Sequence, residues 1–274
     1  MAALPKRVEE RIGLGLKRFQ PILTAARARD VNESDTVVIV TDILQDVFGY
    51  DKYSEITSEH MIRSTFCDLA IKLEGHLALL IEVKAIGLDL KEQFVKQAVD
   101  YAANQGVEWV ALTNGVEWRV YRVAFTKPIE HELVVELDLL GMNPRKAGDL
   151  ELLGLLAKEG WQKARLGDYH SKRQALNRFT LAAVVLSEPV LEVIRREVRR
   201  LAPEVRIDIE GTHNALQTEV LKREVLEGEK AEAARRQVAK AAGKQLRKRR
   251  DSRELAGAIE SQGPPLIPPT ELGT

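Results

Sequence analysis

The chain has 274 residues, 45% of them hydrophobic, and its 41 Lys and Arg balance 41 Asp and Glu, so the formal net charge is zero. That balance argues against a uniformly basic nucleic-acid binder. Cys67 is the single cysteine, which excludes an intrachain disulfide and a zinc site built from cysteines. No apolar run approaches the roughly 20 residues that span a membrane, and charges interrupt the N-terminus where a signal peptide needs an apolar core. We therefore expect a protein of the reducing cytoplasm that makes no membrane contact.

The N-terminal part of the chain is predicted to be mainly helical. Residues 1–30 form an amphipathic helical segment that Pro21 interrupts. Residues 35–48 carry apolar side chains at helical spacing, and Gly49 ends this second helix. Residues 52–64 are expected to be a transition into a sheet.

Two strand-like segments follow at residues 66–73 and 77–85, with a three-residue turn at 74–76 between them. Counting outward from that turn places Asp68 directly opposite Glu82, on the same face of the hairpin. Two opposed carboxylates repel each other, and a bound divalent cation reverses the sign of that interaction. The hairpin therefore predicts a metal site.

Lys84 lies two residues after Glu82 and so emerges on the same face, at the edge of the expected site. An acid-x-Lys triplet on its own is more often a solvated strand face, and that alternative stays open. Residues 79–85 are nearly continuously apolar, however, as in a strand covered on both faces. Charges in such a strand are costly unless they are paired or bound to a metal ion.

The next segment brings two further polar residues toward this site. Residues 89–104 are predicted to form a helix, followed after Gly106 by a strand at 107–113. A strand–helix–strand order places the helix against the sheet. Gln97 and Tyr101 are four apart on one helix face and are expected near the acidic pair. The alternatives are a core aromatic for Tyr101 and an exposed helix residue for Gln97.

The remaining strand signals complete an α/β core. Asn114-Gly115 predicts a two-residue hairpin turn, because both residue types tolerate positive φ. Residues 132–139 are a candidate edge strand. Together the segments predict an α/β fold in which a mixed sheet is flanked by helices.

The order of these residues resembles a known nuclease family. Asp68, Glu82-Val83-Lys84 and Gln97-Ala98-Val99-Asp100-Tyr101 look like the D…ExK…QxxxY signature of PD-(D/E)xK nucleases, in particular the RecB-like branch at the N-terminus of type I restriction endonuclease R subunits. Residues 112–121 (LTNGVEWRVY) also look like that family. The resemblance covers roughly residues 30–125 and implies a restriction-endonuclease-like core, which we place at residues 31–145. The proline that precedes the first acid of the family motif is absent, because Cys67 stands there.

The resemblance implies a role for each matching residue. Asp68 and Glu82 would bind Mg²⁺ (or Mn²⁺) together with the backbone carbonyl of Val83, and Lys84 would orient or activate the attacking water.

Further residues are assigned in the same way. Gln97 and Tyr101 would support the site or contact the DNA backbone. The family often has one more acid on an early helix, for which Glu33 and Glu59 are the two candidates.

The C-terminal part is predicted to be helical and highly charged. We expect a helical accessory region at 146–212, a long charged helix at 213–255 and a disordered Pro-rich tail at 256–274. Residues 235–253 hold nine Lys and Arg against one acid, Asp251. This basic block is either an arm that binds DNA phosphates or the solvated end of a helix.

Smaller elements can be placed inside these regions. The candidate helices are 149–159, 171–186 and 190–201, the candidate extended piece is 205–209, and the candidate breaks in the long helix are Gly228 and Gly243.

No phosphate-binding loop accompanies the nuclease-like residues. The nearest string has Val238 in place of the first glycine and Gln245 after Lys244, so we expect no ATP-driven motor. We predict a Mg²⁺-dependent DNA phosphodiesterase whose partners are DNA and either restriction-modification subunits or a separate motor protein. One alternative is a non-catalytic nucleic-acid-binding or scaffolding protein that retains the nuclease fold. The other is a structural α/β domain whose acids are surface residues.

Overall fold

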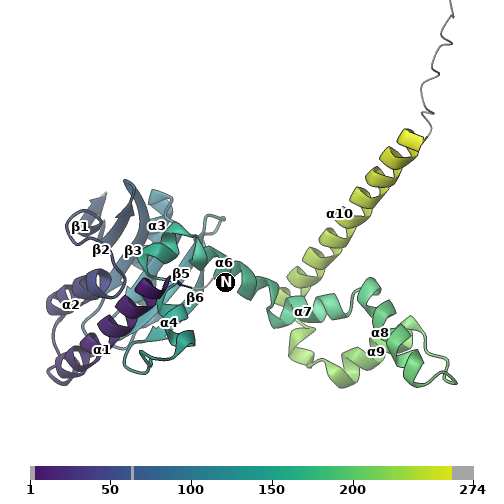
Figure 1. The fold of residues 1–274 in the computed structure, drawn as a ribbon, viewed down its shortest axis with the longest axis horizontal. Helices are drawn as coiled ribbons and strands as arrows, with labels where there is room; N and C mark the ends of the chain where they lie inside the picture. The colour runs from purple at the N-terminus through teal and green to yellow at the C-terminus, as the bar shows by residue number, and fades with distance from the viewer. Residues whose placement is uncertain (1–3, 63–64, 261–274) are drawn as a thin grey trace, which may run out of the picture. The chain divides into compact units, whose positions relative to one another are not determined.

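The computed structural model describes residues 4–62 and 65–260, with the backbone alone for residues 59–62, 65–66 and 245–260. The chain divides into two compact units, Met1–His170 and Ser171–Thr274 (Figure 1). Within the described ranges, no helix is long and apolar enough to cross a membrane.

The first unit contains a six-stranded mixed sheet flanked by helices, which confirms the predicted α/β fold. The strands are β1 Ile56–Ile62, β2 Thr65–Leu73, β3 His76–Val83, β4 Trp109–Thr113, β5 Glu117–Ala124 and β6 Glu130–Asp138. They lie in chain order across the sheet; β3 and β4 run parallel and the other neighbours run antiparallel. The helices are α1 Lys6–Ala28, α2 Glu33–Asp46, α3 Glu92–Gln105, α4 Ala147–Leu153 and α5 Lys158–Gln162, and α6 Arg165–Ala175 contains the boundary between the two units.

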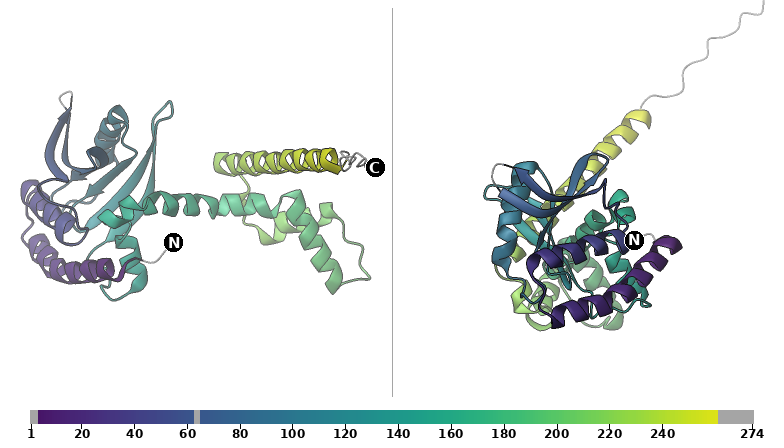
Figure 2. Two further views of the ribbon diagram at one scale, coloured as in Figure 1. Left: turned by 45° about the horizontal axis from the view of Figure 1, so that its top comes forward. Right: turned by 90° about the vertical axis from the view of Figure 1, so that its left-hand side faces the viewer.

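Helices cover both faces of this sheet (Figure 2). The apolar faces of α1 and α2 pack on one side, and α3, which connects the parallel strands β3 and β4, packs on the other. Along β3, Leu79, Ile81 and Val83 belong to the cluster under α1 and α2, whereas Leu80 belongs to the cluster under α3. Because side chains alternate along a strand, Glu82 lies on the α3 side.

The β2–β3 turn differs from the prediction. It has two residues rather than three, Glu74 and Gly75, with φ of 52° and 82°. Leu73 therefore pairs with His76. Two consecutive positive φ values give a turn whose twist matches the flanking strands, which favours this hairpin over a three-residue turn.

A bulge in β3, where Ala78 is the extra residue, then restores the predicted register. The pairing shifts by one residue between Ile71 and Lys72, and from Ile71↔Leu79 onward it is the pairing expected from the sequence. The prediction of the turn was wrong, and the prediction that Asp68 and Glu82 are neighbours survives because the bulge compensates for the shorter turn.

Other local predictions fail where packing outweighs local sequence. Pro21 lies inside α1 without interrupting it. Leu16, Phe19 and Leu23 are buried on both sides of the proline, so packing of the whole helix offsets the lost backbone hydrogen bond. Residues 52–64 were expected to be a transition, yet β1 forms there as an edge strand paired with β2.

The β4–β5 turn is displaced by one residue from its predicted place. Gly115 has φ of 84°, whereas Asn114 N–H donates to Glu117 O at 3.3 Å, so the turn residues are Gly115 and Val116. The Asn114 side chain accepts from Glu117 N–H at 2.7 Å. An Asn before the turn thus stabilises it by a side-chain hydrogen bond rather than by adopting positive φ.

The second unit is helical. Its elements are α7 Arg178–Val185, α8 Glu188–Leu201, α9 Ile209–Ala215, a π-helical turn Leu216–Val220, a 3-10 turn Arg223–Val225 and α10 Glu229–Glu260. The long helix predicted from residue 213 begins only after Gly228, whose φ is 88°, and it runs through Gly243. The predicted helix 171–186 is divided between α6 and α7, because Asn177 caps α7 by accepting from Thr180 N–H.

Two further predictions concern this part of the chain. Residues 205–208 form no strand in the structure, and Ile209 begins α9. Residues 256–260 belong to α10 rather than to a disordered tail, and the remainder of that predicted tail, 261–274, lies outside the described residues.

Candidate functional site

The two predicted acids lie where the pairing of β2 with β3 ends. The strand ladder runs to Leu69↔Ile81, and Asp68 and Glu82 are the next residues of the two strands. The backbone N–H of Val83 donates to Asp68 Oδ2 at 2.7 Å. The Asp68 carboxylate therefore acts where a backbone carbonyl of β2 would otherwise accept.

Lys84 follows β3 directly and forms ion pairs with two carboxylates. Its Nζ lies 2.8 Å from Glu82 Oε1 and 3.4 Å from Glu33 Oε2. Its backbone N–H donates to Thr113 O at 2.8 Å, which anchors the residue against β4. The ring of Phe94, from α3, has its centroid 6.0 Å from Lys84 Nζ, at the limit of cation–π attraction.

Helix α2 supplies the second carboxylate. Glu33 is its first residue, and Asn32 begins the helix by accepting from Asp35 N–H at 2.9 Å. A carboxylate in the first turn is stabilised by the helix dipole. Of the two candidates for an additional acid, the structure thus brings Glu33 to the cluster. Glu59 lies in β1, and its side chain is outside the described residues.

Burial and neighbouring charges change the proton affinities in this cluster. Burial raises the pKa of Glu82; the hydrogen bond from Lys84 opposes that effect, and the charge of Asp68 adds to it, with a raised pKa as the result. Burial alone would lower the pKa of Lys84, but its hydrogen bond to Glu82 and the charges of Glu82, Glu33 and Asp68 outweigh it, so this pKa is also raised. The cluster combines three carboxylates, those of Asp68, Glu82 and Glu33, with the single ammonium group of Lys84.

The two residues predicted on α3 lie in different surroundings. Tyr101 is buried in the apolar cluster between α3 and the sheet, which also contains Cys67. Burial raises the pKa of both groups, that of Cys67 to about 12. Gln97 is exposed, and in the described part of the chain no hydrogen bond joins its side chain to the acids. Tyr101 thus packs beside the strand that carries Asp68, while Gln97 lies on the exposed surface of α3.

The oxygen donors fit a hard divalent cation. Mg²⁺ is commonly bound by one or two carboxylates and completed by water, and Asp68 and Glu82 form such a pair. Their mutual repulsion, which contributes to the raised pKa of Glu82, is relieved by a cation. Among the residues that the structure describes, no group of three or more His, Cys, Asp or Glu could hold a metal ion. An ion here would rest on these two carboxylates, water and backbone.

Two contacts of the site could not be read from the sequence. The Asp68–Val83 hydrogen bond joins a side chain to a backbone group, so it leaves no periodic pattern. Phe94 looks like one apolar position of a helix among others, and its place beside Lys84 follows from how α3 packs on the sheet.

Residues 39–137 match the family described as the type I restriction enzyme R protein N terminus. The match begins inside α2 and ends inside β6, so it includes Asp68, Glu82 and Lys84 and leaves out Glu33 and the second unit. Comparisons with curated proteins and with solved structures found no match. Over its sheet and α3, the first unit is therefore similar to the N-terminal region of restriction R proteins.

Proposed function

We propose that this chain is a metal-dependent DNA phosphodiesterase of the restriction R-protein N-terminal type. The observation that supports the proposal most directly is the cluster of Asp68, Glu82, Lys84 and Glu33 at the end of β3. Two acids and a lysine where the paired strands β2 and β3 end lower the stability of the fold unless they are paired or bound to an ion. The family match over residues 39–137 contains three of these four residues.

The proposed chemistry assigns a task to each side chain. Asp68 and Glu82 would hold Mg²⁺ (or Mn²⁺), which would neutralise charge on the scissile phosphate and lower the pKa of a bound water. Lys84 donates to a phosphate oxygen or orients the attacking water. Glu33 positions Lys84 by holding its ammonium from the α2 side.

Residues around this centre complete the proposal. Tyr101 supports β2 by packing in the apolar cluster between α3 and the sheet. Gln97, which is exposed on α3, is a candidate contact for the DNA backbone. DNA is the proposed substrate, and restriction-modification subunits or a separate motor protein are the proposed partners.

One observation favours a second function. Lys84 already neutralises Glu82 at 2.8 Å, an arrangement that also suits a fold without catalytic metal. The alternative is a non-catalytic nucleic-acid-binding or scaffolding protein that retains the nuclease fold.

Plasmid nicking by the purified full-length chain separates the two functions. We expect Mg²⁺- or Mn²⁺-dependent conversion of supercoiled to open-circular DNA, and about a 100-fold lower rate for Lys84→Ala, the loss typical of one stabilising donor. Lys96→Ala removes an exposed lysine of α3 outside the cluster and is expected to keep the wild-type rate. Equal rates in wild type and Lys84→Ala, or no nicking of any DNA form with either metal, would contradict the phosphodiesterase and favour the alternative.

A further inference from the structure

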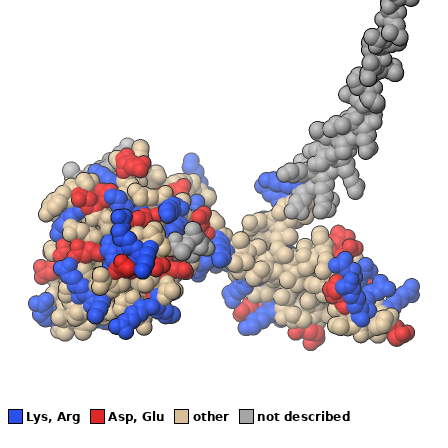
Figure 3. All heavy atoms as spheres, in the orientation of Figure 1, with Lys and Arg blue, Asp and Glu red and all other residues tan. Residues whose placement is uncertain are grey.

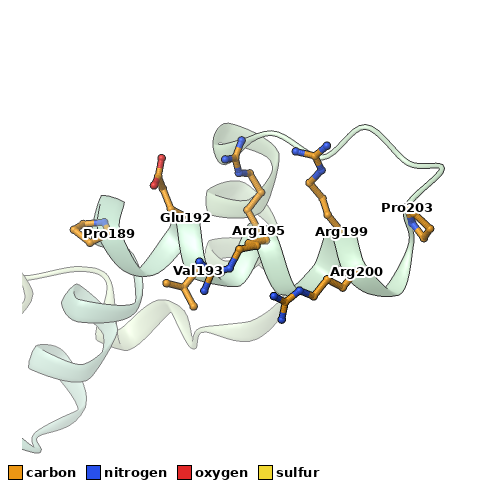
Figure 4. A pocket seen from close by; sticks show the side chains of 8 residues that line it. Pro189, Glu192, Val193, Arg195, Arg199, Arg200 and Pro203 are labelled. Atoms are coloured by element: carbon orange, nitrogen blue, oxygen red, sulfur yellow. The ribbon is translucent and has the colours of Figure 1, made fainter.

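Helix α8 presents four arginines along one part of its surface. Arg195, Arg196, Arg199 and Arg200 occupy positions i, i+1, i+4 and i+5, so they form two adjacent columns whose members are one helical turn apart. With Glu192 and the two flanking prolines, Pro189 and Pro203, they line an open depression of about 430 Å³ (Figure 4).

These arginines outnumber the acids beside them. Glu197 pairs with Arg196 at 3.3 Å and with Arg200 at 2.7 Å. No ion pair of Arg195 or Arg199 occurs within the described residues. The Arg195 Nε is buried without a hydrogen-bond partner there. Arg195 and Arg199 are thus not held by the acid that engages Arg196 and Arg200.

Arg195, Arg196, Arg199 and Arg200 follow one another along the helix, and we call them the arginine row. Figure 4 shows Glu192, Arg195 and Arg199 on one side of α8, and Val193 and Arg200 on the other. Successive arginines of a column are four residues apart. Their Cα atoms therefore lie about 6 Å apart along the helix axis, because each residue adds about 1.5 Å. The positive charges are thus repeated along the helix in two columns rather than converging on one point.

The sequence distributes its charge unevenly between the two units. Residues 1–170 hold 26 acids and 21 Lys and Arg, whereas residues 171–274 hold 15 acids and 20 Lys and Arg. The excess of the second unit lies in residues 235–274, with nine Lys and Arg against four acids, whereas residues 171–234 hold 11 of each. Figure 3 shows Lys and Arg side chains gathered at the end of the second unit that carries α8 and α9.

We propose that the arginine row of α8 binds the phosphate backbone of duplex DNA. Guanidinium groups recognise phosphate oxygens bidentately and are less strongly hydrated than lysine ammonium groups, which suits all four positions being arginine. A repeated line of cations beside an open depression fits a polyanion better than a compact ligand. The choice of DNA as the polyanion rests on the proposed function of the first unit, whereas the site itself does not.

The test measures binding without catalysis. A fluorescent short duplex is titrated with the full-length chain in EDTA, by anisotropy, between about 50 and 200 mM salt. The variant Arg195→Gln/Arg199→Gln removes the two arginines that lack acidic partners. Lys222→Gln/Arg223→Gln removes the same charge from exposed positions elsewhere in the second unit. Arg199→Glu changes a single exposed residue and leaves Arg195 in place. Circular dichroism shows whether each variant is folded.

We expect Arg195→Gln/Arg199→Gln to lower the affinity about tenfold and to make the slope of log affinity against log salt shallower by about 1.8, since each phosphate contact contributes about 0.9. Arg199→Glu lowers the affinity in the same direction, and the control double variant keeps most of it. Binding in EDTA is read without any nicking, so a failure of the phosphodiesterase proposal is distinguishable from a failure of this one.

Two outcomes overturn the proposal. Equal losses in the α8 variant and in the control would mean that net charge alone sets the affinity. Unchanged DNA binding combined with lost binding of a poly-glutamate peptide would assign the arginine row to an acidic protein segment instead.

Discussion

Asp68 stabilises the fold through a hydrogen bond, in addition to its proposed catalytic role. Val83 is fully buried, and its N–H faces β2 at the point where the strand ladder has ended. The Asp68 carboxylate accepts from that N–H at 2.7 Å. A buried N–H without an acceptor costs about 1–3 kcal/mol. One residue therefore stabilises the end of β3 and supplies a carboxylate to the cluster.

We expect Asp68→Asn and Asp68→Ala to differ in stability but not in activity. Both variants remove the negative charge and relieve its repulsion of Glu82, so both should abolish metal-dependent nicking. Asparagine keeps an oxygen that can accept from Val83 N–H, and alanine does not. Urea unfolding should show Asp68→Ala about 1–3 kcal/mol less stable than Asp68→Asn. Equal stabilities would show that this hydrogen bond contributes little to the fold.

The candidate site was only partly predictable at this scale. Glu82 and Lys84 follow from alternation along one strand, a local rule, and the structure brings them together at 2.8 Å. Gln97 was expected beside them because it shares a helix face with Tyr101. In the structure Tyr101 is buried and Gln97 is exposed, so four-residue spacing alone does not fix the rotation of α3 about its axis. That rotation follows from which side chains of α3 pack on the sheet.

At the scale of elements, one ion pair joins the N-terminal helix to a helix far along the chain. Arg11 of α1 donates through Nη1 and Nη2 to the two carboxylate oxygens of Glu159 in α5, both at 2.8 Å. The same guanidinium donates to the carbonyls of Val47 and Phe48 at the end of α2. A bidentate pair whose guanidinium also satisfies two carbonyls is stronger than an isolated surface pair. It holds α1, α2 and α5 together on one side of the sheet.

This pair predicts a pH dependence of stability. The hydrogen bond from Arg11 holds the pKa of Glu159 below its usual value, although partial burial opposes that effect. Because the folded-state pKa is depressed, the stabilisation is present above the unfolded-state pKa and is lost as pH falls through the folded-state pKa. We expect Glu159→Gln to lower the free energy of unfolding by about 1–2 kcal/mol at neutral pH. The difference from wild type should shrink as the pH falls below about 4.5.

Denaturant unfolding at a series of pH values checks this expectation. Glu151→Gln is the control, since Glu151 is an exposed carboxylate of the neighbouring helix α4. A Glu159→Gln effect that stays constant down to the lowest pH would mean that the pair acts by packing and not by charge.

The turn of the β2–β3 hairpin is the clearest difference between sequence and structure among the elements. Glu74 and Gly75 adopt positive φ, although Glu is not a residue type that favours it. The bulge at Ala78 of β3, opposite the step from Ile71 to Lys72, absorbs the resulting one-residue offset. Apolar residues of β2 and β3 must reach opposite faces of a doubly covered sheet, and that requirement fixes the register more strongly than the turn does.

At the scale of the molecule, the described core of the first unit is complete without the second. Its two apolar clusters draw on residues from Leu4 to Leu166. All three tryptophans, Trp109, Trp118 and Trp161, belong to this unit. Tryptophan fluorescence therefore reports on the first unit alone, whereas far-ultraviolet circular dichroism reports on both.

We expect a chain shortened to residues 1–176, which ends after α6, to fold. Its thermal midpoint by tryptophan emission should lie within about 2 °C of the full-length value, the shift that ~1 kcal/mol produces in a domain of this size. Circular dichroism should show less helix by the loss of α7 to α10. A markedly lower midpoint, or unfolded emission at room temperature, would show that the first unit depends on the residues removed.

The sequence by itself determined the strand–helix–strand order around Glu82, the α/β class and the neighbouring positions of Asp68 and Glu82, because alternation and helical spacing are local properties of the chain. The spacing of the four arginines in α8 can also be read directly from the sequence. Tertiary structure decided the rest: that α1 runs through Pro21, that β1 pairs as an edge strand, that Glu33 reaches Lys84, and that Gln97 stays exposed. Each of these depends on contacts between segments far apart in the chain. Such contacts gain their energy only when the apolar faces of both partners are buried together, and no single segment specifies its partner.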